Sequence, residues 1–234
     1  MHRIFTLAAS LAFLTVFTFK PSTVLSAGSP STKNPSTASS HAATPNSARE
    51  DFELGWKYLF GIGVPKDEAK GKALIRKAAE SGDADAQFNY GISCTKGKRG
   101  AQGFAEAVKW YRKAAEQGHM FAQVNLGICY AKGSGVSQNH SEAVKWYRRA
   151  ADQGDAYAQK NLGVCCAKGE GVAKNDVDAY KWFNLAAAQG FEGAADYRER
   201  IAADMTPDKI AEAQRLSSSF VPRKESAPLP AGHR

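Results

Sequence analysis

The sequence has few of the residues that form metal centres or acid–base sets. It contains 4 cysteines and 5 histidines in 234 residues. The histidines are scattered over the N-terminal region, the loops and the tail, at His2, His41, His119, His140 and His233. Because no C-x-x-C pair and no cluster of histidines is present, we expect no metal site. We also expect no cofactor and no catalytic residue set.

Long apolar runs are equally scarce. One run, Ile4 to Phe19, follows the basic start of the chain and ends at Lys20-Pro21, before small residues that include Ser26 and Ala27. This layout is typical of a secretory signal peptide, here residues 1–27. The alternative is an uncleaved anchor, although the run is short for crossing a bilayer. We therefore expect an exported protein, periplasmic or extracellular, with no membrane span after cleavage.

Proline is confined largely to the two ends of the chain. Residues 28–48 are mainly Ser, Thr, Pro, Ala and Asn, and residues 219–234 contain three of the 9 prolines. Such segments bury too little apolar surface to fold, so we expect a disordered linker and a disordered tail. The formal net charge of +8 favours acidic partners, unless it serves solubility alone.

Between these ends the sequence repeats itself. Residues 141–154 match residues 105–118 and 177–190 at a step of 36, and residues 74–82 are a fainter copy. A fixed period of this length indicates a repeat architecture. The units run over about 49–83, 84–119, 120–155 and 156–191, and residues 192–218 have the pattern of two further, capping helices.

Each unit contains two helical patterns separated by glycines. In the third unit Ala122, Leu126, Gly127 and Tyr130 share one face of the first helix. The glycine recurs in every unit, which predicts helices too close there to admit a side chain. The second helix carries an acid near its start and cations near its end, which complement the helix dipole. We interpret the cation pairs as ordinary solvated residues; they are Arg76-Lys77, Arg112-Lys113 and Arg148-Arg149.

These motifs resemble the Sel-one-like repeat (SLR) family, a relative of the tetratricopeptide repeat. The third and fourth units follow its pattern of A-x-x-x-L-G-x-x-Y, G-x-G-V and E-A-x-x-W-Y-x-x-A-A-x-Q-G almost throughout. Two units depart from this pattern. The first has Leu74 in place of the tryptophan, and the second has Cys94 in place of the tyrosine and residues 97–100 in place of the G-x-G-V turn. The predicted fold is an all-α, right-handed α/α superhelical solenoid of four 36-residue helix pairs with a C-terminal capping pair.

The outer face of the first helices carries three repeated rows of residues. An asparagine row, an apolar row and a lysine row recur at 36-residue steps, and the resemblance implies that this face is concave. Amides can pair with the main chain of a peptide, lysines with its carboxylates, and apolar residues with its side chains. The predicted partner-binding residues are Asn89, Ile92, Lys96, Val124, Asn125, Ile128, Lys132, Asn161, Val164 and Lys168. The alternative is that these residues only solvate the helices and contact neighbouring units.

Two other residue types receive structural interpretations. Trp110, Trp146 and Trp182 have the spacing of core residues, so no aromatic nucleic-acid platform is expected. The cysteines are expected to be small buried side chains, with a Cys94–Cys129 disulfide as the exception that the pattern leaves open.

One motif favours an enzyme. Residues Ser93 to Lys96 match the S-x-x-K motif of penicillin-recognising enzymes, and some cysteine-rich relatives of the repeat are described as β-lactamases. No S-D-N or K-T-G partner motif follows, and the cysteine pairing of those relatives is missing. We therefore predict a non-catalytic scaffold that binds a protein or peptide, and keep a cell-envelope enzyme or enzyme regulator as the alternative.

Overall fold

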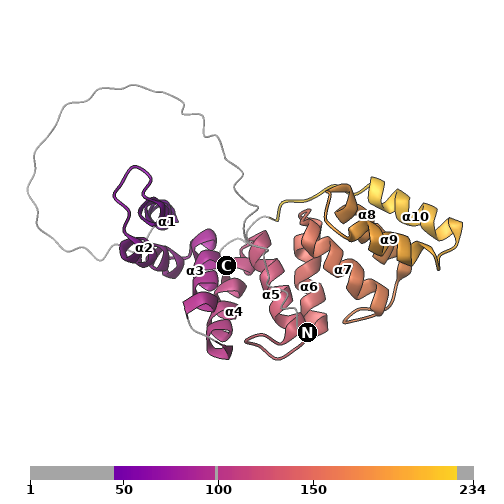
Figure 1. The fold of residues 1–234 in the computed structure, drawn as a ribbon, viewed down its shortest axis with the longest axis horizontal. Coiled ribbons are helices and arrows are strands. Elements are labelled where there is room, and N and C mark those ends of the chain that lie inside the picture. Colours follow the sequence, from indigo (N-terminus) through magenta and orange to yellow (C-terminus); the bar gives the residue numbers. More distant parts are fainter. Residues whose placement is uncertain (1–44, 98–99, 226–234) are drawn as a thin grey trace, which may run out of the picture. The chain divides into compact units, whose positions relative to one another are not determined.

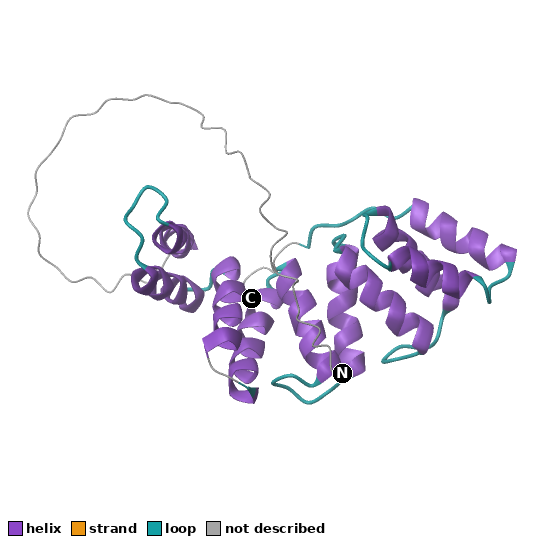
Figure 2. Cartoon of the chain, in the orientation of Figure 1, coloured by secondary structure: helices purple, strands orange, loops and turns teal. Residues whose placement is uncertain are grey.

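A computed structural model describes residues 45–97 and 100–225 of the chain. This part is helical, with ten helices joined by turns and no strand within the described ranges (Figures 1 and 2). The predicted signal peptide, most of the predicted linker, Lys98-Arg99 and residues 226–234 lie outside the described residues. The all-α fold class is confirmed.

The helices form four consecutive pairs and a terminal pair. Each first helix packs on the second helix of its own unit, and each second helix packs on the first helix of the next unit. The repeat pairs are α1 (Pro45–Phe60) with α2 (Glu68–Glu80), α3 (Ala84–Gly97) with α4 (Ala101–Glu116), α5 (Met120–Lys132) with α6 (His140–Asp152), and α7 (Ala156–Lys168) with α8 (Asp176–Ala188). The terminal helices α9 (Ala194–Ala202) and α10 (Pro207–Ser218) both pack on α8.

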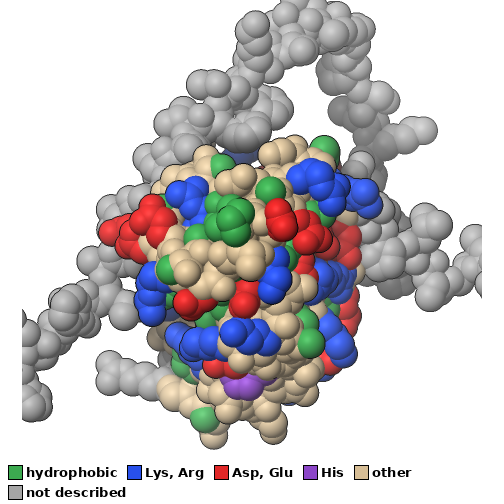
Figure 3. Space-filling model, turned by 90° about the vertical axis from the view of Figure 1, so that its right-hand side faces the viewer, with side chains coloured by type: hydrophobic (Ala, Val, Ile, Leu, Met, Phe, Trp, Pro, Cys, Tyr) green, Lys and Arg blue, Asp and Glu red, His purple; other side chains and the backbone are tan. Residues whose placement is uncertain are grey.

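This terminal pair covers the last repeat with a mixed polar surface. Seen from that end, lysine, arginine, aspartate and glutamate side chains are interspersed around small separate hydrophobic areas (Figure 3). An array of identical units would otherwise leave the apolar face of its last unit exposed to water. The arrangement agrees with the capping role predicted for residues 192–218.

Side-chain caps define where the helices begin. Asn139 and Asn175 accept a hydrogen bond from the third residue of the helix they precede, each at 3.0 Å. Asp83 and Asp155 cap α3 and α7 in the same way at 2.7 Å. Each cap satisfies a backbone N–H that the first turn of a helix would leave without a partner. The boundaries of the units are therefore encoded locally.

Small residues allow the two helices of a unit to approach closely. A Cβ atom added at Gly127 would lie 2.6 Å from the Tyr147 ring, and one at Gly163 would lie 2.7 Å from the Phe183 ring. The same relation holds between Gly91 and Tyr111. Each contact is closer than two carbon atoms can pack, so the predicted reason for the recurring glycine is confirmed.

The predicted core residues fall into two groups. Trp182 is fully buried, whereas Trp110 and Trp146 are half-buried and pack against the edge of the core.

All four cysteines are buried and none is disulfide-bonded, so the Cys94–Cys129 bond is not formed. Burial raises the pKa of Cys129 to about 11, which keeps it protonated and inert.

Both ends of the folded region extend further than the sequence predicted. Helix α1 begins at Pro45 rather than after residue 48, and Ala48 is buried against the first unit. At the other end the predicted tail starts at residue 219, yet Phe220 packs edge-on against Trp182 with ring centroids 5.8 Å apart. Among the described residues no helix is both long and apolar enough to cross a bilayer.

Candidate partner-binding site

The predicted asparagine row lies on the first helices α3, α5 and α7. Each amide donates a hydrogen bond to the backbone carbonyl four residues earlier, at 2.8 Å for Asn89, 2.9 Å for Asn125 and 3.0 Å for Asn161. The side-chain oxygen of Asn161 also accepts a hydrogen bond from the ammonium group of Lys160 at 3.0 Å. One N–H of each amide is therefore engaged by its own helix, and the other N–H is left for a ligand.

The apolar row is less exposed than the sequence indicated. Ile92, Ile128 and Val164 are half-buried and pack against the core. Val124 lies in the core, with 8% of its surface exposed. It therefore offers little surface to a partner.

The lysine row is fully at the surface. Lys96, Lys132 and Lys168 are all exposed at the ends of their helices. Lys168 pairs with Glu170 at 3.5 Å. Among the described residues Lys96 and Lys132 have no carboxylate within ion-pair distance, so their charges are available to a ligand.

The structure brings one member of each row together around a hollow. This hollow has a volume of 740 Å³ and lies between α1, α2 and α3. It is lined by Trp56, Leu59, Lys72, Ala73, Ile75, Arg76, Asn89, Tyr90, Ile92, Ser93 and Lys96. Its floor is apolar, while the amide and the cations lie at its rim, the pattern that is usual for binding sites.

A second hollow adjoins the first. It has a volume of 540 Å³ and is lined by Phe52, Glu53, Trp56, Lys57, Asp85, Phe88, Asn89, His119 and Phe121. Trp56 and Asn89 line both hollows, so the two form one continuous surface, here called the double hollow. At the other end of the array, Val164 and Lys168 line a separate 540 Å³ hollow beside α9.

Trp56 is the main residue of this site that sequence reasoning missed. It is 36% exposed, and its ring stacks on Phe60 with centroids 4.8 Å apart. Trp56 stands 36 positions before Ile92, in the same repeat position as the apolar row. Extending that row back into the first unit would have found it.

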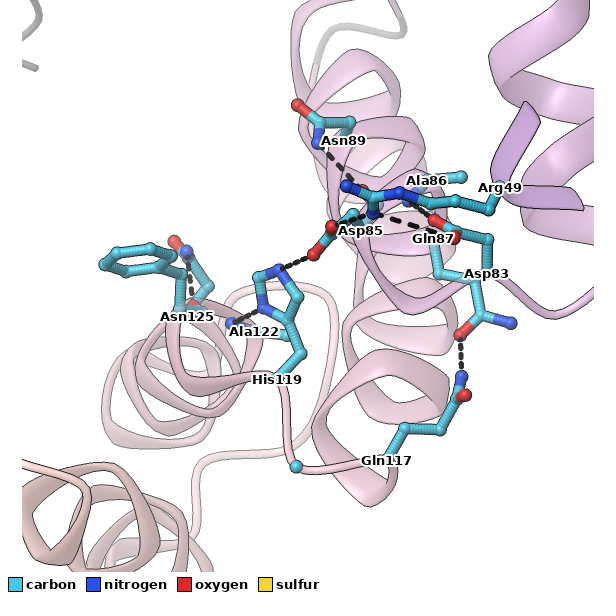
Figure 4. A network of polar contacts seen from close by, with 12 residues as sticks. Arg49, Asp83, Asp85, Ala86, Gln87, Asn89, Gln117, His119, Ala122 and Asn125 are labelled. Carbon is cyan, nitrogen blue, oxygen red and sulfur yellow. Dashed lines mark hydrogen bonds and ion pairs between the residues drawn. The ribbon is translucent and has the colours of Figure 1, made fainter. Parts of the chain in front are cut away.

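A polar network lies beside the double hollow (Figure 4), and its members Asp85 and His119 line the second hollow. His119 caps α5, where its Nδ1 accepts from the backbone N–H of Ala122 at 3.1 Å. Its Nε2 lies 3.2 Å from one carboxylate oxygen of Asp85, and the other oxygen of Asp85 accepts from Arg49 of α1. The hydrogen bond from His119, aided by Arg49, lowers the pKa of Asp85 to about 2 despite partial burial. This network ties α1, α3 and α5 together beside the site.

The predicted enzyme motif has a structural contact of its own. Ser93 lies at the edge of the larger hollow, and its hydroxyl donates to the carbonyl oxygen of Tyr90 at 2.7 Å. In the described ranges no group of three or more His, Cys, Asp or Glu side chains is placed to hold a metal ion.

Four consecutive helix pairs with the same internal contacts place the protein among α/α repeat proteins. Within that class, the Sel1 repeat matches residues 52–83, 84–119, 121–155 and 156–191, which together span more than half of the chain. The chain therefore belongs to the Sel1 repeat family, as the sequence motifs predicted. Proteins of this family are generally scaffolds for protein–protein interactions.

Solved structures similar to this chain include two proteins with the same repeat fold. A Sel1 repeat protein from Oxalobacter formigenes is 34% identical with a TM-score of 0.62, covering 76% of each chain. A protective antigen of uropathogenic Escherichia coli strains, displaying an SLR fold, is 28% identical with a TM-score of 0.67. That match covers 80% of this chain and only 43% of the E. coli protein. A comparison with curated protein sequences gives no match.

Proposed function

We propose that the protein is an exported, non-catalytic scaffold that binds a partner protein or peptide on its first-helix face. The observation that carries the proposal is the double hollow, where Trp56 and Asn89 stand between two cavities. Binding energy at protein interfaces is concentrated in a few aromatic and charged residues that fill or line pockets. An exposed tryptophan beside a preformed hollow fits that description.

The charges at the rim define the chemistry of the partner. Lys72 and Arg76 already pair with Glu68 and Glu80 on their own helix, at 3.4 Å and 2.8 Å. Lys57 and Lys96 line the hollows and have no ion pair among the described residues. The site therefore suits a segment with a large apolar side chain and a neighbouring carboxylate. Asn89 would orient the main chain of that segment.

Affinity capture from native extract tests this function. The site variant is Trp56→Ser with Lys96→Glu, and the matched control is Leu54→Ser with Lys109→Glu. Leu54 is as exposed as Trp56, at 37%, and lies on the same helix outside both hollows. We expect that wild type and the control variant retain the same partner and that the site variant loses it. A partner retained by all three proteins would place the binding surface elsewhere.

Two further assays address export and the enzyme alternative. Mass spectrometry of the protein from its native host should give an N-terminus near residue 28, and an intact Met1 would contradict cleavage.

Hydrolysis of nitrocefin by the purified protein should not exceed background. Turnover that is lost in Ser93→Ala would overturn the non-catalytic proposal.

A further inference from the structure

The chain continues beyond α10 along the surface of the repeats. Residues 219–225 run back from α10 past α8 towards α6 and α5 (Figure 1). Phe220 contacts Trp182 of α8, and the backbone N–H of Arg223 donates to the carbonyl of Asp152, at the end of α6, at 2.9 Å. The segment thus passes the middle of α8 and reaches the end of α6.

Its last described residue is held by a specific site for a carboxylate. Glu225 accepts two hydrogen bonds from Arg149 into one oxygen, at 2.9 Å from Nε and 2.5 Å from Nη2. Its other oxygen accepts from Gln123 Nε2 at 2.6 Å. Charge-assisted bonds of this kind are stronger than neutral ones. Arg149 therefore holds a carboxylate of the same chain, which differs from the ordinary solvated cation that the sequence suggested.

Gln123 is buried and belongs to a ladder of glutamines. Its side chain is fully shielded, donates to the Ala115 carbonyl at 3.1 Å, and accepts from Gln153 at 2.8 Å. The bond to Glu225 uses its remaining N–H. Gln87 and Gln159 make the same two bonds, but their second N–H has no acceptor among the described residues. Both side chains are buried, and an acceptor bonded to the second N–H would stabilise such an amide.

Glycines let an extended chain approach this surface. A Cβ atom at Gly118 would lie 3.0 Å from the backbone oxygen of Glu225, and one at Gly154 would lie 3.3 Å from Pro222. The equivalent Gly82 has open space at the same position. We call the surface formed by these residues the glutamine–glycine face; it comprises Gly82, Gln87, Gly118, Gln123, Gly154 and Gln159.

We propose that the glutamine–glycine face is a second binding surface, for extended peptide segments of a partner that carry a carboxylate, and that residues 220–225 are its built-in ligand. The subsite at Gln123 and Arg149 is filled by Glu225. One repeat earlier, Gln87 has Lys113 in the position of Arg149, and Lys113 lies over Trp110 as Arg149 lies over Trp146. One repeat later the position is Leu185, which supplies no cation.

This surface differs from the first-helix face in the ligand it takes and in being partly occupied by a segment of its own chain. A tethered ligand is present at a high effective concentration, so a free peptide must displace it to reach the occupied subsite. The protein therefore binds such peptides weakly at that subsite until its own segment is released. The proposal does not depend on the double hollow.

Competition between the tethered segment and a free copy tests the proposal. The probe is a labelled peptide with the sequence of residues 219–225, and the full-length variant Phe220→Ser with Glu225→Gln releases the tethered segment. We expect the probe to bind this variant at least about tenfold more tightly than wild type. Adding Arg149→Ala to the variant should abolish the gain, and so should a probe whose glutamate is replaced by glutamine. Equal binding to variant and wild type, or no binding to either, would overturn the proposal.

A second measurement covers the case in which the triple variant does not fold. Hydrogen exchange of the Arg223 amide in the wild-type chain should be slow, because this amide is bonded to Asp152. The single substitution Arg149→Ala should accelerate it by at least about tenfold if Glu225 anchors the segment. An unchanged rate would show that Arg149 does not hold the segment.

Discussion

At the scale of single residues, a repeated position acquires a new role when its residue type changes. His119 caps α5 at the position where the neighbouring first helices have Asp83 and Asp155. Because Nδ1 accepts from the backbone, the ring proton lies on Nε2 and points to Asp85. A capping residue thereby also links α3 to α5, next to the double hollow.

The carboxylate of Asp85 gives this link a defined pH dependence. Its pKa lies near 2, below the ordinary value of 3.8, so its contribution to stability is present above about pH 4 and is lost as the pH falls towards 2. Asp85 is partly exposed, and we expect Asp85→Asn to cost about 0.5–1 kcal/mol at pH 7. Urea unfolding of wild type and Asp85→Asn at pH 7 and at pH 2.5 would measure the difference in their free energies of unfolding. A cost as large at pH 2.5 as at pH 7 would contradict this account.

The glycine inside the first helix is a second single-residue effect. Gly127→Ala should gain about 1 kcal/mol of helix propensity and lose more by overlap with Tyr147, for a net destabilisation of about 1–2 kcal/mol. Thermal or urea unfolding would measure the change. Adding Tyr147→Leu to Gly127→Ala should recover part of the loss, because a smaller side chain relieves the overlap. An alanine variant as stable as wild type would show that the helices can separate at no cost.

At the scale of helices, local signals set the boundaries of the elements. Asn139, Gly133 and the Gln153-Gly154 turn each define a helix end through contacts within a few residues. The apolar row was harder to interpret, because the burial of Val124 depends on packing between helices and not on the pattern within its own helix. Trp56 was missed because the first unit lacks the second-helix tryptophan that makes the other units easy to align.

The local nature of the caps can be tested on α6. Asn139→Ala should destabilise the protein by about 1 kcal/mol, because the N–H of Glu142 loses its acceptor. Asn139→Ser should be close to neutral, since serine supplies an acceptor of similar reach. Equilibrium unfolding of the two variants would separate loss of the cap from loss of the side chain. An alanine variant as stable as the serine variant would contradict the assigned role.

At the scale of the whole molecule, neighbouring units stabilise one another in sequence. Contacts of this kind were predictable, since they follow from the 36-residue period and the helix patterns within it. The contacts of residues 220–225 were not predictable. Glu225 meets Arg149 across 76 positions, and no local pattern distinguishes that glutamate from one in a solvated tail. The same holds for the two hollows, which exist only where three or more helices meet.

The most direct test of the central claim is photo-crosslinking to the partner identified by affinity capture. A benzophenone amino acid would replace Trp56 or Lys96 in the double hollow, and Leu54 or Lys109 outside it, one position at a time. The account predicts crosslinks to the partner from positions 56 and 96 and none from positions 54 and 109. Crosslinks only from positions 54 and 109 would show that the first-helix face is not the binding surface.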